Sequence, residues 1–197
     1  MTSDLLRRAL TDPGELDLRP LPERARGLLE LLNAPPRLAG HLRLVHDVAC
    51  LLTDWVRRHH PEADFDRAAV LFGAATHDIG KVVHVDELSG PGSAHERAGY
   101  ESLLANGVEE GMARFARTHA SWGEAGIGLD DLLVSLADKV WKAKRVADLE
   151  QLVVDRLAAA SGQESWEVFM ALDDELDRIA AGADRRLEFQ SAHPVSG

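Results

Sequence analysis

Residues 67–81 of this chain read RAAVLFGAATHDIGK. Its run AAVLFGAAT is apolar on nearly every side, which predicts a helix over about 66–78 at the centre of a helical bundle. His77 and Asp78 follow this buried helix directly, and we expect Gly80 to end it in a left-handed conformation. A polar helix end on the surface is the other interpretation of the His-Asp pair, and it fits poorly with the apolar residues upstream.

Helical periods recur through the rest of the chain, and the alternation that indicates strands is absent. The spacing predicts further helices over about 3–10, 21–33, 36–59, 94–106, 109–121, 130–160 and 164–182. We expect Ser3, Asp130 and a Ser93–Glu96 capping box at helix N-termini, and a frayed tail over residues 191–197. The sequence therefore predicts an all-α protein, a compact bundle of about seven to eight helices.

Length, charge and cysteine content narrow the classes of protein and partner. The chain has 197 residues, a formal net charge of −11 and a single cysteine. We expect one domain, and no apolar run approaches the roughly 18–20 residues that span a bilayer. The N-terminus breaks up too early for a secretory leader, so we expect a cytoplasmic protein. The acidic charge argues against nucleic acid and membranes as partners, and a small anionic substrate would need cations concentrated locally.

Several of the nine histidines fall among apolar residues. His41 lies within the apolar arc of the 36–59 helix, and His119 shares a face with the apolar residues of its own helix. Both are expected to point inward, whereas His95 lies in the first turn of its helix. Taken alone, each has an ordinary interpretation as a core or a surface histidine.

Asp138 lies in the expected 130–160 helix, on the side opposite the main apolar stripe. An ion pair with Lys142 one turn later is the ordinary interpretation of this residue. Imidazole and carboxylate together, however, suit divalent transition metals. The candidate metal ligands are therefore His41, His77, Asp78, His95, His119 and Asp138, spread over five helical segments.

Five short motifs in order give this set a specific resemblance. They are HLRLV at 41–45, HDIGK at 77–81, HERAG at 95–99, RTH at 117–119 and ADK at 137–139. Over roughly 36–146 the chain resembles the HD-domain superfamily of metal-dependent phosphohydrolases. The resemblance implies a bundle of the HD-domain type, as a single domain over 1–197. Its metal-binding core would cover about 36–146, and a C-terminal helical extension about 147–190.

The resemblance also implies how the ligands divide. His41, His77, Asp78 and Asp138 would hold one metal, and Asp78 would bridge to a second metal held by His95 and His119. One or two divalent ions are expected, and the sequence does not distinguish Mn, Fe, Co, Ni, Zn and Mg. Two cations about 3.5–4 Å apart can clamp a phosphoryl group and lower the pKa of a water that attacks phosphorus.

Basic residues near the motifs indicate where a substrate binds. Lys81 resembles the family lysine that faces the substrate, and Asp78 and Lys81 are the expected catalytic residues. Lys81 is also expected to bind phosphate, together with Lys142 and Arg145, which follow Asp138 on adjacent turns of the expected helix. A solvated helix face is the alternative for this basic run. The loop over 82–93 is a natural lid.

Other functions stay open at this point. A di-iron HD-domain oxygenase, such as the myo-inositol oxygenases, uses the same ligands, and a non-catalytic nucleotide-binding regulatory domain is the second alternative. Hydrolysis is favoured over the oxygenase because it is the commoner use and because the chain is short, and the complete set of candidate ligands argues against the non-catalytic domain. The expected substrate is a small anionic phosphoester, with a nucleotide as one candidate. The sequence leaves its identity open, and also the oligomeric state, for which a homodimer is one option.

Overall fold

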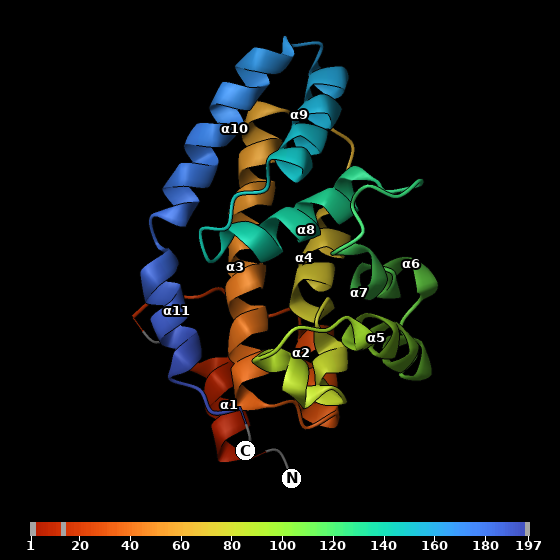
Figure 1. Ribbon diagram of the computed structural model, residues 1–197, viewed down its shortest axis with the longest axis vertical. Helices are drawn as coiled ribbons and strands as arrows, with labels where there is room; N and C mark the ends of the chain where they lie inside the picture. The colour runs from red at the N-terminus through yellow and green to blue at the C-terminus, as the bar shows by residue number, and fades with distance from the viewer. Residues whose placement is uncertain (1–2, 13–14, 196–197) are drawn as a thin grey trace.

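The computed structural model describes residues 3–12 and 15–195, and within these ranges the chain is helical without a strand (Figure 1). The predicted all-α class is therefore confirmed. The longest helix is α3 (Pro36–His59), drawn in orange, and it runs through the bundle. The other α-helices are α1 (Asp4–Thr11), α2 (Glu23–Leu31), α4 (Arg67–Thr76), α5 (Ala94–Ala105), α6 (Glu110–Ala113), α7 (Phe115–Thr118), α8 (Leu129–Val140), α9 (Ala147–Ser161), α10 (Ser165–Ala180) and α11 (Ala183–Ser191). Two 3-10 helices, η1 (Ile79–Val82) and η2 (Val85–Leu88), lie between α4 and α5.

The helix α3 organises the core because it packs against α1, α4, α8 and α11. One apolar cluster joins its C-terminal half to α4, α8, α9 and α10. A second cluster joins its N-terminal half to α1, α2 and residues around α5. Each fully buried leucine or valine contributes about 1.5–3 kcal/mol, so both halves of α3 are firmly fixed. His41 lies on α3 directly before Leu42 of the second cluster and one turn before Val45 of the first.

Two of the predicted helices are wrong in extent, and one helix was not predicted. The helix expected over 130–160 ends at Val140, and the chain turns through Ala143, whose φ is +58°, before α9 begins. A left-handed alanine is uncommon, and no glycine or proline marks this turn in the sequence. The helix expected over 109–121 divides into α6 and α7, and α11 follows α10 after Gly182. The bundle consequently has more helices than the seven to eight expected.

The expected N-caps are confirmed at one helix and wrong at two. The hydroxyl of Ser3 accepts the third backbone N–H of α1 at 3.1 Å. Ser93 makes no capping bond, and Glu87 caps α5 instead. Asp130 lies inside α8, whose N-cap is Gly128. The sequence did not indicate this cap because the capping carboxylate, that of Glu87, lies in a separate loop before α5.

Gly80 serves a different purpose from the predicted left-handed helix end. The helix α4 ends before it, and Gly80 lies inside η1. A Cβ at Gly80 would overlap the carbonyl oxygen of His95 and the amide of Gly99. The backbones of η1 and α5 therefore touch at this point, which only glycine permits. This contact brings Asp78 beside His95.

The C-terminal tail is fastened where frayed residues were expected. The backbone N–H of Arg37 donates to the carbonyl oxygen of Pro194 at 3.0 Å, and its Nε donates to the carbonyl of His193 at 2.9 Å. The prediction is therefore wrong for residues 191–195, while 196–197 lie outside the described residues. In the ranges that the structure describes, none of the helices has the length and hydropathy needed to cross a membrane.

Candidate metal centre

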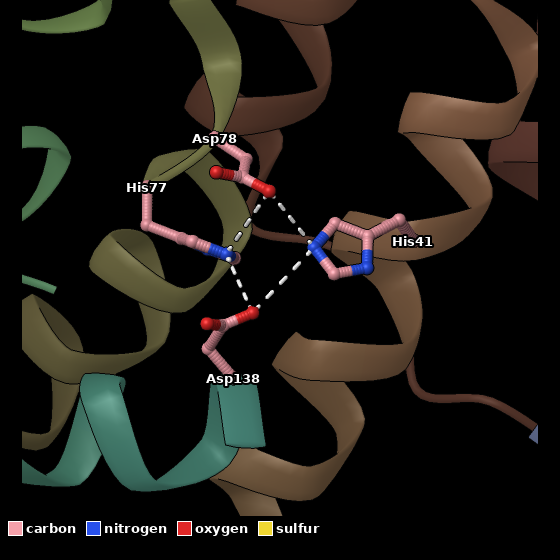
Figure 2. A group of neighbouring side chains, drawn as sticks. All are labelled: His41, His77, Asp78 and Asp138. Carbon is pink, nitrogen blue, oxygen red and sulfur yellow. Dashed lines mark ion pairs between the residues drawn. The ribbon is translucent and has the colours of Figure 1, made fainter. Parts of the chain in front are cut away.

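Four of the candidate ligands converge where α3, α4 and α8 meet (Figure 2). Nε2 of His41 lies 3.1 Å from Oδ2 of Asp78 and 3.8 Å from Oδ1 of Asp138. Nε2 of His77 lies 3.6 Å and 3.3 Å from the same two oxygens. None of the four residues is more than 7% exposed. Ligand bonds of about 2.0–2.2 Å place neighbouring ligand atoms of one ion roughly 3–3.5 Å apart, so these four can share an ion.

A second group shares Asp78 with the first. Oδ1 of Asp78 lies 3.0 Å from Nε2 of His95 and 3.6 Å from Nε2 of His119. His95 lies in the first turn of α5, and His119 directly follows α7. Asp78 thus presents one oxygen to each group. The structure brings all six candidate ligands together, as two buried groups joined by one carboxylate.

The hydrogen bonds of the outer ring nitrogens show that these residues fit a cation. Nδ1 of His77 lies 3.0 Å from the carbonyl oxygen of Ala74, and Nδ1 of His119 lies 3.2 Å from that of Phe115. A carbonyl oxygen only accepts, so both Nδ1 atoms carry the hydrogen, and in the neutral imidazole each Nε2 atom presents a lone pair. These lone pairs face the oxygens of Asp78, which also only accept. A cation between the opposed acceptors satisfies both, as in other histidine–metal sites.

The protonation states also suit metal binding. Burial by itself raises the pKa of Asp78, but the neighbouring imidazoles of His77, His41 and His95 outweigh it and hold that pKa well below its usual range. Burial lowers the pKa of His41, and it lowers the pKa of His119 to about 4. Near neutral pH the carboxylate is therefore ionised and these two imidazoles are neutral, which is the form that binds divalent metals.

Comparison with known proteins agrees with this geometry. A family model described as "HD domain" matches residues 39–142, which is more than half of the chain. The chain belongs to the HD domain family. Searches of curated proteins and of solved structures found no match. The resemblance drawn from the five sequence motifs is therefore confirmed for the family, and the activity within the HD domain family is a separate question.

Two lysines contact the carboxylates of the candidate metal ligands Asp78 and Asp138. Nζ of Lys81 is 2.6 Å from Oδ2 of Asp78, and Nζ of Lys139 is 2.5 Å from Oδ2 of Asp138. Both side chains are mostly buried, and the Lys139 ammonium also lies 5.5 Å from the ring centroid of Trp122. Lys139 was not among the predicted site residues because neighbours on a helix face different directions. Its long side chain reaches back to the adjacent carboxylate, and the ADK motif was the available signal.

Lys142, a predicted substrate-binding residue, lies close to the first metal group. Its Nζ is 5.6 Å from the ring centroid of Trp141, and that ring packs edge-on against His41 with centroids 5.1 Å apart. Desolvation lowers the pKa of Lys142, and the nearby carboxylates of Asp138 and Asp78 oppose this shift. Lys142 itself is exposed, and the Trp141 ring lies between it and His41. Trp141, which forms a wall of the first group, had no predicted role.

Arg145, the other predicted substrate-binding residue in the basic run, has different partners. Its guanidinium pairs with Glu150 at 2.8 Å, Asp173 at 2.5 Å and Asp177 at 2.6 Å. The prediction for Arg145 relied on a continuous helix after Asp138, and that helix is wrong. The structure therefore gives Arg145 the task of tying the start of α9 to α10.

Proposed function

We propose that this HD-domain protein is a metal-dependent phosphohydrolase that cleaves a small phosphoester, such as a nucleotide, with two divalent ions and water. The observation that carries the proposal is that Nε2 of His77 and Nε2 of His119 face different oxygens of Asp78, while their Nδ1 atoms are hydrogen-bonded to backbone carbonyls. With both imidazoles neutral, this arrangement suits a cation on each side of Asp78.

The chain's own cations support phosphate as the substrate group. Lys81 and Lys139 contact the carboxylates of Asp78 and Asp138, and Lys142 lies beside the Trp141 ring, in a chain whose formal net charge is −11. A local concentration of positive charge attracts a small anion despite the acidic surroundings. The ammonium groups of Lys81 and Lys139 are charged donors that can exchange a carboxylate oxygen for a phosphate oxygen. Divalent ions in the two groups would add the charge that lowers the pKa of a water and neutralises phosphoryl oxygens.

The burial of the ligands supports a small substrate. His77 is fully buried, and His95 and His119 are 5% and 4% exposed. A reacting group has to enter between side chains to reach them, which suits a slender phosphate at the end of a small molecule. We therefore propose neither nucleic acid nor a membrane as a partner of this site.

A phosphate-release screen tests the proposal. The protein is loaded in turn with Mn²⁺, Fe²⁺, Co²⁺, Ni²⁺, Zn²⁺ and Mg²⁺ and is offered nucleotides and sugar phosphates. The expected result is phosphate release with at least one pairing, lost in Asp78→Asn while the helical circular dichroism persists. Stoichiometric iron with O₂ consumption and no phosphate release would favour the oxygenase instead. Nucleotide binding without turnover in the metal-loaded protein would favour the regulatory domain.

A further inference from the structure

Glu87, in η2, makes three contacts with the start of α5. Its Oε1 accepts the backbone N–H of Ala94 at 3.1 Å, and its Oε2 accepts the backbone N–H of His95 at 3.1 Å. Oε2 is also hydrogen-bonded to Nδ1 of His95. A carboxylate suits the positive end of a helix, and Ser93 makes no capping bond there. One side chain therefore begins α5 and orients the ring of His95.

This support distinguishes His95 from the other ligands of the metal centre. His77 and His119 are oriented by backbone carbonyls of the helical turns that precede them, at Ala74 and Phe115. Those carbonyls stay in place whatever the neighbouring side chains are. His95 alone, among the histidines of the described centre, is oriented by a carboxylate from a separate segment eight residues away. Its Nε2 is buried and faces Oδ1 of Asp78.

The loop around Glu87 is shaped to hold its carboxylate. A Cβ at Gly92 would overlap Oε1 of Glu87, so the loop backbone closes directly over it. Only 13% of the Glu87 side chain is exposed. The neighbouring Leu88 packs against the apolar cluster of α1, α2 and the N-terminal half of α3. The loop over 82–93 is therefore connected both to the core and, through Glu87, to a metal ligand.

We propose that Glu87 is a positioning residue that couples the loop over 82–93 to the second metal group, formed by Asp78, His95 and His119. The inference rests on the proposed two-metal centre and assigns a distinct task within it. With Glu87 in place, His95 is held with Nε2 toward Asp78. Because coupling between two events is reciprocal, an ion bound at His95 also holds the loop closed.

Titration with Mn²⁺ alone tests whether Glu87 strengthens ion binding by the second metal group. Wild type, Glu87→Gln, Glu87→Ala and the adjacent control Asp86→Asn are compared by calorimetry. We expect two Mn²⁺ per chain in wild type and in the control. In the Glu87 variants the first ion binds as before and the second binds about 10–100-fold more weakly, the usual effect of removing such a carboxylate from a histidine ligand. Glu87→Gln retains the side-chain volume and is expected to lose less than Glu87→Ala.

Hydrogen exchange tests whether a bound ion holds the loop closed. Saturating Mn²⁺ is expected to slow amide exchange across residues 84–95 in wild type and to have a much smaller effect in Glu87→Ala. If Glu87 only caps α5, its variants lower the melting temperature and leave the second-ion affinity unchanged, and that result overturns the inference while the metal centre stands. If wild type binds no Mn²⁺ and no other divalent ion, the proposed function fails together with the inference.

Discussion

Asp78 turns Oδ1 toward Nε2 of His95 at 3.0 Å, on the side of the carboxylate away from the oxygen that faces His41. The two ligand groups are therefore linked by a single residue, although their other members lie far apart in the chain. The link depends on the backbone contact of Gly80 with the start of α5. Changes at Asp78, at Asp138 and at Gly80 consequently have separable effects.

Asp78→Asn is expected to remove both ions, because the amide cannot supply a negative oxygen to either group. Asp138→Asn is expected to weaken only the first group, since Asp138 does not belong to the second. Metal content measured by mass spectrometry after equilibration with Mn²⁺ distinguishes the two variants. If Asp78→Asn retained a full equivalent of metal, Asp78 would not be a ligand shared by the two groups.

Gly80→Ala is expected to destabilise the protein by about 1–3 kcal/mol or more, because overpacking against backbone atoms cannot be relieved by a side-chain rotation. The matched control is Gly27→Ala in α2, where a Cβ meets no atom within 4 Å. That substitution is expected to stabilise the helix by about 0.5–1 kcal/mol. Urea denaturation measures both free energies, and equal stability of the two variants would contradict the close contact.

Arg145 and Lys142 are expected to affect different measurements. Arg145→Met leaves the buried carboxylate of Glu150 without its charged partner, which costs about 1.5–3 kcal/mol of stability. Its KM for a phosphorylated substrate is expected to stay unchanged. Lys142→Met is expected to raise KM and to leave the melting temperature near that of wild type. If Arg145→Met raised KM and left the stability unchanged, Arg145 would belong to the substrate site.

Much of the candidate metal centre could be predicted from the sequence, and the errors have physical causes. His41 and His119 could be assigned because their helical registers point them inward, and the five motifs supplied Asp138. Arg145 was misplaced because Ala143 adopts a left-handed conformation without a glycine or proline to indicate it. Glu87 was missed because a capping side chain that lies in a separate loop leaves no periodic pattern in the sequence.

The fold shows the same division between local and distant determinants. The limits of α3 were predicted correctly because Pro36 and the apolar stripe are local features. The tail was expected to fray because its partner, Arg37 on α3, lies about 150 residues earlier in the sequence. Gly80 was assigned to a helix end because the backbone contact that requires it involves α5.

Acid is expected to destabilise the protein through His46, a buried histidine outside the metal centre. Burial lowers its pKa from 6.5 to about 4 in the folded state. Below pH 6.5 the unfolded chain binds a proton at His46, whereas the folded chain does not bind it until the pH is about 4. The stabilising contribution is therefore fully present above pH 6.5 and is lost as the pH falls toward about 4. The slope is about 1.4 kcal/mol per pH unit.

Urea denaturation of the metal-free protein between pH 4 and 7 measures this slope. His46→Leu is expected to reduce it, because leucine fills the site without a titrating group. Nδ1 of His46 has no hydrogen-bond partner, and its Nε2 contacts only the weakly polar Sγ of Cys50, at 3.8 Å, so the substitution leaves no strong donor or acceptor without a partner. An unchanged pH dependence in His46→Leu would assign the effect to other residues.

Anomalous X-ray diffraction from crystals equilibrated with Mn²⁺ shows whether two ions bind on opposite sides of Asp78. Two manganese peaks are predicted inside the bundle, one among His41, His77 and Asp138 and one between His95 and His119, each within bonding distance of a different oxygen of Asp78. Peaks confined to the protein surface, with the six side chains bound to no ion, would contradict the account.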